Sequence, residues 1–421
     1  MAQFSEDVVH DFLFETGLRH LVDDTDAFGE DDATGDEEEF QLWRIIRARA
    51  IAKLERLHNS VRHGEFLGSK IKLPTDHTRP MELDLIGSHD SGLFILELKV
   101  DRAAERNAFS ELFAYSNYLA GMFALSGHKD ITNVLVSAME VKITRQAYLY
   151  DLLIADRDVL VYAPVFLTDE LHSLRLRLHV PSDDEFKRFT NQLLSHDAMA
   201  CAVITIDDLA GWIDNKEEGG SLNERTRRHL SGLSNYAAQL MEEERLHGFC
   251  FIRKFWNSIP YSDRSSLFIC ALNPFRLAEL DRANAVTAQM DLEHHATLFE
   301  APKFAFYDRL IRLAQRVVSD GLTHGARGEV EVPLWRAVVT SVSEVAISHN
   351  FAFRPTGMVR EAYVSYLNGI YARNASATSY KEDVSKLKIE EVFNWLRAWM
   401  FMESCGFRDH EEPEEKDDYQ S

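Results

Sequence analysis

The sequence is poor in cysteine and has no long apolar run. Four cysteines occur among 421 residues, at positions 201, 250, 270 and 405, and none has Cys-x-x-Cys spacing. This pattern predicts no disulfide framework and is typical of a reducing compartment. The sequence also lacks any apolar run of about 18 residues. Its first residues do not show the basic segment followed by an apolar segment that is typical of a signal peptide. We therefore expect a soluble, cytoplasmic protein with no membrane partner.

Motifs for several enzyme classes are missing as well. The stretch GEFLGSK (64–70) does not satisfy the pattern of a phosphate-binding loop. No Gly-x-Ser-x-Gly motif of a serine hydrolase occurs. The stretch DLEHHATLFE (291–300) contains Glu293, His294, His295 and Glu300, but adjacent histidines point about 100° apart on a helix. We expect a surface helix there.

Negative charge dominates, but it is concentrated at the two ends. The net charge is −22, of which residues 1–39 hold −13 and residues 409–421 hold −6, so residues 40–408 carry only −3. Acidic ends of this kind predict solvated tails. The alternative is that they mimic DNA and cover a basic groove until the substrate competes for it. The nearly neutral remainder can carry a local basic face, so nucleic acid is not excluded as a partner.

Length and hydrophobic patterning predict several domains. We expect an acidic, partly disordered segment over 1–39, an α/β domain over 40–180, a smaller α/β segment over 181–275, a helical domain over 276–408 and an acidic tail over 409–421. The α/β domain begins with a helix and continues in the order β-β-β-α-β-α-β. This order predicts a mixed sheet flanked by helices.

Charged residues interrupt an apolar hairpin in the stretch MELDLIGSHDSGLFILELKV (81–100). The pattern predicts antiparallel strands over 81–87 and 92–100 with a turn between them. Because side chains alternate along a strand, Asp84, Glu97 and Lys99 can share one face, and a row of leucines lies opposite. The hairpin therefore brings two carboxylates and an ammonium group together.

Two close carboxylates repel each other unless a cation lies between them. Asp84 and Glu97 offer hard oxygen ligands, which suit Mg²⁺ or Mn²⁺. Lys99 would orient or deprotonate the attacking water and counter the charge that develops on a phosphate. The alternative is an edge hairpin whose charged side chains face water.

The spacing Asp-x(12)-Glu-x-Lys, with Glu-x-Lys inside the apolar strand LFILELKV, resembles the PD-(D/E)xK superfamily of restriction-endonuclease-like nucleases. The resemblance covers residues 40–166 and includes the order of helices and strands. It implies a restriction-endonuclease-like fold in which Asp84 and Glu97 bind the metal and Lys99 is catalytic. Glu55, on the helix before the hairpin, is similar to an additional metal-binding acid of many members.

The resemblance extends to the helix that follows the strand with Lys99. Many members have a Gln and a Tyr there, and here Glu111, Tyr115 and Tyr118 lie along one stripe. Tyr115 matches the family tyrosine and is expected to brace the site. Glu111 departs from the pattern and would add negative charge.

Two groups of basic residues are candidates for contact with phosphate. Arg44, Arg47, Lys53 and Arg56 lie on the helix that begins near residue 40, and Arg225, Arg227 and Arg228 lie at the start of a long central helix. A solvated helix face is the alternative for both groups.

The sequence thus predicts a metal-dependent DNA endonuclease or exonuclease. The family resemblance implies a role in bacterial DNA repair or in defence against foreign DNA. The rival hypothesis is a catalytically silent nuclease-like fold that acts as a protein-binding or regulatory module, which the acidic ends and Glu111 favour. A protein partner at the C-terminal region or the acidic tails, and a homodimer, are left open.

Overall fold

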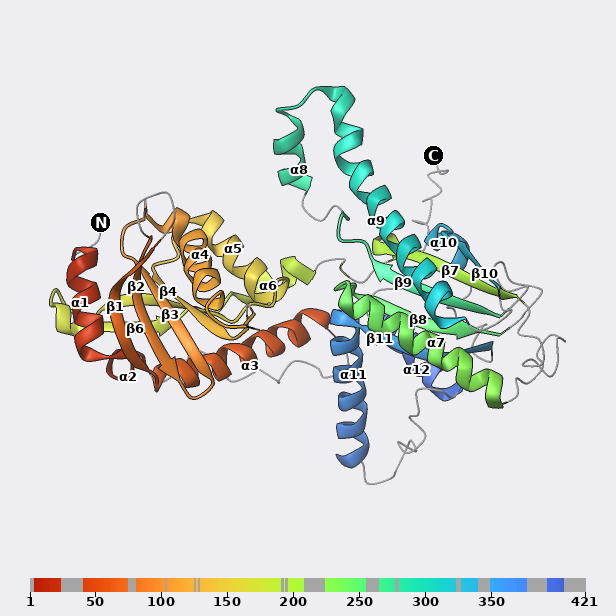
Figure 1. Cartoon of the computed structure of the whole chain (residues 1–421), viewed down its shortest axis with the longest axis horizontal. Helices are drawn as coiled ribbons and strands as arrows, with labels where there is room; N and C mark the ends of the chain where they lie inside the picture. The colour runs from red at the N-terminus through yellow and green to blue at the C-terminus, as the bar shows by residue number, and fades with distance from the viewer. Residues whose placement is uncertain are drawn as a thin grey trace, which may run out of the picture. The chain divides into compact units, whose positions relative to one another are not determined.

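The chain folds into two compact units, drawn from the computed structural model in Figure 1. Unit 1 comprises Met1–Gly35 and Ile46–Phe186, and unit 2 comprises Asp36–Ile45 and Lys187–Ser421. The structure describes residues 4–23, 41–74, 81–102, 104–124, 126–127, 129–190, 193, 196–207, 224–254, 265–276, 280–322, 327–339, 349–376 and 392–404. Of the predicted acidic segment over 1–39, residues 4–23 are described and form the helices Glu6–Thr16 and Leu18–Leu21, whereas residues 24–39 and the acidic tail over 409–421 lie outside the described residues.

Unit 1 is built on a six-stranded mixed sheet. Its strands are β1 (Glu65–Leu73), β2 (Met81–His89), β3 (Gly92–Lys99), β4 (Ile131–Ser137), β5 (Val159–Phe166) and β6 (Leu174–Leu178). They lie side by side in sequence order. β1, β2 and β3 are antiparallel, β3, β4 and β5 are parallel, and β6 is antiparallel to β5. The predicted mixed α/β class is therefore confirmed.

Helices accompany this sheet, and the two that span 42–62 and 183–190 belong to unit 1 only in part. They are α1 (Glu6–Thr16), α2 (Leu18–Leu21), α3 (Leu42–Arg62), α4 (Ala108–Ala120), α5 (Lys142–Leu153) and α6 (Asp183–Thr190). α3 buries Ile46, Ala50, Leu54 and Leu57, which lie three or four residues apart and so share one helix face. α4 packs on β3 and β4. Among the described residues, no helix is both long and apolar enough to cross a bilayer.

Unit 2 has a five-stranded antiparallel sheet between two layers of helices. Its strands are β7 (Met199–Asp207), β8 (Gly248–Arg253), β9 (Ser266–Leu272), β10 (Arg327–Glu331) and β11 (Asn350–Thr356), in the order β10-β7-β9-β8-β11. Its helices are α7 (Glu224–Glu243), α8 (Leu280–Thr287), α9 (Leu292–Gly321), α10 (Trp335–Val338), α11 (Gly357–Ser376) and α12 (Val392–Ser404).

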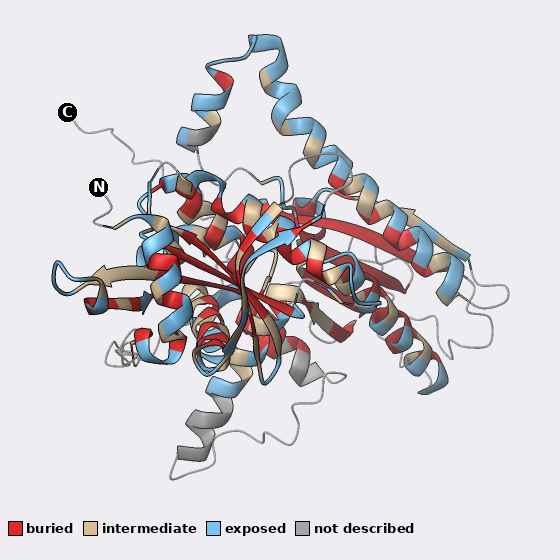
Figure 2. Ribbon diagram, turned by 60° about the vertical axis from the view of Figure 1, so that its left-hand side comes forward, coloured by how far each residue is buried: buried red, intermediate tan, exposed pale blue. Residues whose placement is uncertain are grey.

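Alternation along the strands builds two cores in unit 2. Cys250 and Ile252 of β8 join the core beneath α7 and α9, whereas Phe249 and Phe251 join the core shared with α10, α11 and α12. Figure 2 shows this burial concentrated in strands, while the outer helix faces are exposed.

The C-terminal half differs from the sequence prediction in two respects. Residues 276–408 were expected to be helical, but they contain the strands β10 and β11. These strands pair with β7 and β8, so one sheet joins the expected segments 181–275 and 276–408. The predicted division at residue 275 is therefore wrong, because short edge strands produce little periodic signal of their own.

Candidate active site

Asp84, Glu97 and Lys99 lie together in the interior of the unit 1 sheet. Leu85 pairs with Leu96 in the β2–β3 ladder, which places Asp84 opposite Glu97. On its other edge β3 pairs with β4, where Lys99 lies beside Ser137. β3 is therefore not an edge strand, and the alternative of a solvated edge hairpin is wrong.

Polar contacts hold each of these three side chains in place. The Asp84 carboxylate accepts a hydrogen bond from the Leu98 backbone N–H at 2.8 Å. The Lys99 ammonium donates to Glu97 Oε1 at 2.6 Å and also contacts Glu111 Oε2, on α4, at 2.9 Å. Glu97 is only 2% exposed, and its second oxygen, Oε2, has no hydrogen-bond partner in the described structure. A bound cation would satisfy that oxygen.

Burial makes the acids of this cluster reluctant to ionise. Burial, followed by the charge of Asp84, raises the pKa of Glu97 to about 8. Burial also raises the pKa of Asp84, against the hydrogen bond from Leu98. For Tyr115, burial and then Glu97 raise the pKa to about 12. Ionisation of these acids is therefore costly in the folded protein, and a bound divalent cation would offset that cost.

Lys99 remains a cation in this environment. Burial lowers its pKa, but the charges and hydrogen bonds of Glu97 and Glu111 more than offset that effect, so the pKa lies above its usual range. The role that this arrangement favours is a fixed positive charge and hydrogen-bond donor. Deprotonation of water by Lys99, one of the two predicted roles, is not favoured.

The helix α1 supplies two side chains that the sequence did not predict. The charge of Glu6 interacts with Lys99 and Asp84, and the Val100 backbone amide favours its ionised form. Burial is the main reason that the pKa of Glu6 is raised. His10, on the same helix face, is buried and contacts the Asp84 carbonyl oxygen at 3.1 Å. Glu6 and His10 are four residues apart and so share one helix face, and this spacing is the signal in the sequence that could have identified them.

Glu55 does not join the cluster as predicted. Its side chain is exposed on α3, and it is absent from the charges that act on Asp84 and Glu97. The further carboxylate near these acids comes from Glu6 instead. Tyr115, in contrast, is buried on α4 and interacts with the charges of Glu97, Glu111 and Lys99.

The donor set fits a hard divalent cation. Asp84 and Glu97 offer carboxylate oxygens beside one ammonium group, and one oxygen of Glu97 is buried without a partner. Glu6 acts on Asp84 and Lys99 through its charge, but the ligand atoms of Glu6, Asp84 and Glu97 do not all lie within 4.8 Å of one another. A second acidic group, Asp291, Glu293 and His294, has its ligand atoms within 4.8 Å of one another, but all three side chains are exposed on or beside α9. This exposure agrees with the surface helix expected there.

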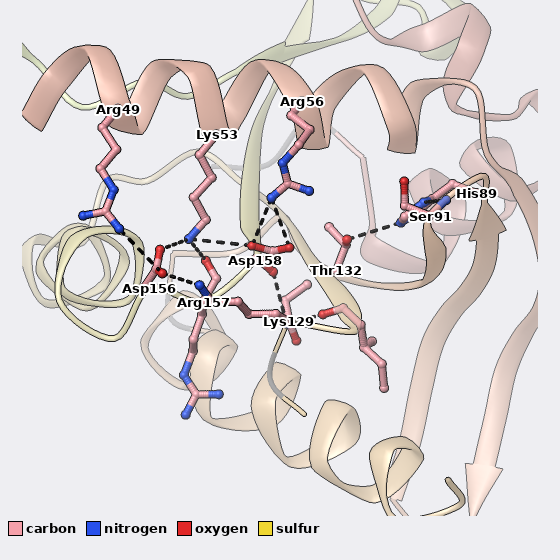
Figure 3. A network of polar contacts seen from close by, with 12 residues as sticks. Arg49, Lys53, Arg56, His89, Ser91, Lys129, Thr132, Asp156, Arg157 and Asp158 are labelled. Carbon is pink, nitrogen blue, oxygen red and sulfur yellow. Dashed lines mark hydrogen bonds and ion pairs between the residues drawn. The ribbon is translucent and has the colours of Figure 1, made fainter. Parts of the chain in front are cut away.

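The predicted phosphate contacts on α3 are mostly engaged within the protein. Lys53 is 12% exposed and donates to Asp156 at 3.0 Å and to the Arg157 carbonyl oxygen at 2.5 Å. Arg56 approaches Asp158 at 3.4 Å. Figure 3 shows these side chains reaching from α3 to the turn before β5. That turn lies at the amino end of β5, opposite the end of the parallel strands that carries Lys99.

Lys53→Met is expected to lower the free energy of unfolding by about 1–3 kcal/mol, because the largely buried carboxylate of Asp158 and that of Asp156 lose a partner. DNA affinity should stay unchanged. Chemical denaturation with a DNA-binding titration would measure both quantities. Arg49→Ala is the control, because Arg49 is half exposed and contacts Asp156 only at 3.8 Å. Reduced DNA affinity in the folded Lys53 variant would contradict this structural role.

The remaining predicted basic residues also have partners. Arg47 forms an ion pair with Asp183 at 2.7 Å. Arg44 belongs to unit 2 and lies over the Trp43 ring at 5.6 Å. In α7, the Arg227 guanidinium lies 5.8 Å from the centre of the Phe351 ring, Arg228 pairs with Glu224 at 2.9 Å, and Arg225 is also engaged. Nucleic-acid binding by these residues stays a prediction.

Comparison with family models, curated proteins and solved structures gave no match for this chain. Its function must therefore be inferred from the site itself.

Proposed function

We propose that the chain is a metal-dependent nuclease that hydrolyses DNA phosphodiester bonds. The observation that carries this proposal is the buried Glu97 carboxylate, whose unpartnered oxygen lies in a cluster with Asp84 and Lys99. A protein that needed these residues only for stability would gain more from apolar side chains at the centre of its sheet. Perturbed acids gathered at one point favour a functional site.

The architecture of unit 1 supports a restriction-endonuclease-like fold. An antiparallel meander carries the acids and the lysine, and the parallel strands β4 and β5 follow with α4 and α5 between the strands. This is the order that the resemblance to the PD-(D/E)xK superfamily implies. The helix α1, with Glu6, adds a further acid from the N-terminal side.

Each residue of the cluster has a role in the proposed mechanism. Asp84 and Glu97 would hold Mg²⁺ or Mn²⁺, and the ion would supply Lewis-acid polarisation of the scissile phosphate. Lys99 donates a hydrogen bond and places positive charge where the phosphate becomes more negative. Glu97 fixes the ammonium of Lys99 at 2.6 Å. Tyr115 is buried within reach of these charges and would brace the site.

The purified chain is expected to cleave DNA with Mg²⁺ or Mn²⁺ and to lose activity in EDTA. Linear and circular duplexes, single strands and RNA would be compared to define the substrate. Lys99→Met keeps the apolar stem but removes the charge, so cleavage should fall by about 10²–10³-fold. This variant, purified identically, also controls for contaminating nucleases. Equal cleavage by both proteins would refute the proposal.

A catalytically silent regulatory module is the second candidate. Glu111 favours it, because this carboxylate holds the Lys99 ammonium at 2.9 Å and stands where related nucleases often have Gln. A chain that binds Mn²⁺ without cleaving any of these substrates would support this candidate.

A further inference from the structure

Two loops leave the sheet beside the candidate active site and are joined by a buried acid. The first loop follows β3 and includes the short helix Ala104–Asn107, and the second runs from β4 to α5. Glu105 of the first loop is 2% exposed. Its carboxylate accepts hydrogen bonds from the backbone N–H groups of Val141 at 2.8 Å and Glu140 at 3.3 Å.

A second contact holds the same loops together. The Thr144 hydroxyl, in the first turn of α5, donates to the Glu105 carbonyl oxygen at 3.3 Å. Met139, between β4 and α5, has a φ of 56°, a left-handed conformation that is costly for a residue with a side chain. The Arg145 guanidinium donates to the Met139 carbonyl oxygen at 3.2 Å. The paired loops therefore form a defined surface.

This surface lies directly next to the acid cluster. Lys99 and Ser137 are neighbours in the parallel β3–β4 ladder and are the last residues of their strands. Both loops start there, at the carboxyl ends of parallel strands, where α/β sheets commonly bind ligands.

Three cations project from the joined loops without an acidic partner. Arg102, Arg106 and Lys142 are exposed, and none forms an ion pair in the part of the chain that the structure describes. Arg47 and Lys53, in contrast, each form an ion pair with an aspartate. Asp101 and Glu140 are exposed on the same loops, so the loops offer individually placed cations and not a strongly positive field.

We propose that the joined β3–α4 and β4–α5 loops bind the phosphodiester backbone of a nucleic acid through Arg102, Arg106 and Lys142, beside the scissile phosphate. This inference rests on the proposed nuclease function and assigns the substrate contacts of that site. Guanidinium groups bind phosphate oxygens in a bidentate manner, and lysine adds a point charge. The buried Glu105 fixes both loops so that these cations are placed before the substrate arrives.

The test is a salt-dependent binding titration with the full chain in EDTA, where no cleavage occurs. Fluorescence anisotropy would follow a labelled DNA duplex, a single DNA strand and an RNA strand of the same sequence. The test variant is Arg102→Ala/Arg106→Ala/Lys142→Ala. The matched control is Arg49→Ala/Arg56→Ala/Lys129→Ala, which removes as many positive charges from the opposite end of the parallel strands.

The test variant is expected to bind at least about tenfold more weakly and to reduce the slope of log affinity against log salt by about two. The control should stay within about twofold of the wild type. Arg102→Lys/Arg106→Lys/Lys142→Arg should recover most of the affinity, and thermal melts would verify folding of all variants. Equal loss in the test variant and the control, or no binding by the wild type, would overturn the proposal.

Binding and cleavage separate this inference from the proposed function. If the wild type binds through these residues but cleaves nothing with Mg²⁺, the surface is upheld and the nuclease proposal fails. If the wild type cleaves and the test variant binds and cleaves normally, the nuclease proposal is upheld and the surface is refuted.

Discussion

Asp84→Asn is expected to reduce Mg²⁺-dependent cleavage by about 10³-fold or more, which corresponds to a loss of about 4 kcal/mol of transition-state stabilisation. The amide has the size of the carboxylate and can still accept the hydrogen bond from Leu98, which now measures 2.8 Å. What it lacks is the negative oxygen that a hard cation requires. The change therefore tests metal binding with little disturbance of the fold.

Two measurements complete this test. Calorimetric titration with Mn²⁺ should show weaker binding to the Asp84 variant, and single-turnover cleavage should show the loss of rate. Glu82→Gln is a matched control, because Glu82 lies two residues away on the same strand face but is exposed. Full cleavage by the Asp84 variant, or equal loss in the Glu82 variant, would sink the assignment.

Glu97→Gln is expected to stabilise the metal-free protein at pH 8 while it abolishes cleavage. The pKa of Glu97 rises from an ordinary 4.5 to about 8 on folding. The folded state therefore holds this proton more tightly than the unfolded state does. Ionisation of Glu97 costs no stability below pH 4.5, costs progressively more as the pH rises, and reaches its full cost above about pH 8.

Glutamine removes that cost because it does not ionise. We expect a gain in the free energy of unfolding of about 1–4 kcal/mol at pH 8 and none at pH 4, since one pKa unit corresponds to about 1.4 kcal/mol. Denaturation at several pH values in EDTA would measure the difference. In the wild type, added Mg²⁺ should recover the stability at pH 8. A gain of equal size at pH 4 and pH 8 would contradict the assigned cause.

The sequence predicted the parts of the site that depend on local order. Asp84, Glu97 and Lys99 belong to one hairpin, so strand alternation and a short turn suffice to bring them together. The continuous apolar residues around Glu97 favour an interior strand over a solvated edge, because a strand buried on both faces needs them. The apolar face of α3 was likewise readable from its spacing.

Contacts between residues far apart in the sequence could not be predicted from local patterns in this way. Glu6 and His10 reach the acids from a helix almost eighty residues earlier, and nothing in the hairpin indicates that helix. The basic residues of α3 looked suited to phosphate, but Asp156 and Asp158, about a hundred residues later, neutralise Lys53 and Arg56. A charge pattern along one helix does not reveal its partners, so the sequence could not show that Lys53 is paired with aspartate, and its contact with nucleic acid stays a prediction.

The order of strands in unit 2 has a consequence for synthesis on the ribosome. β7, β8 and β9 are made early, but the strands that cover their two open edges, β10 and β11, are made only after the long helix α9. Until residue 331 has emerged, the nascent sheet exposes unpaired backbone on both sides, and until residue 356 has emerged it does so on one side. Premature termination within or soon after α9 should thus yield aggregating fragments and not a smaller folded product.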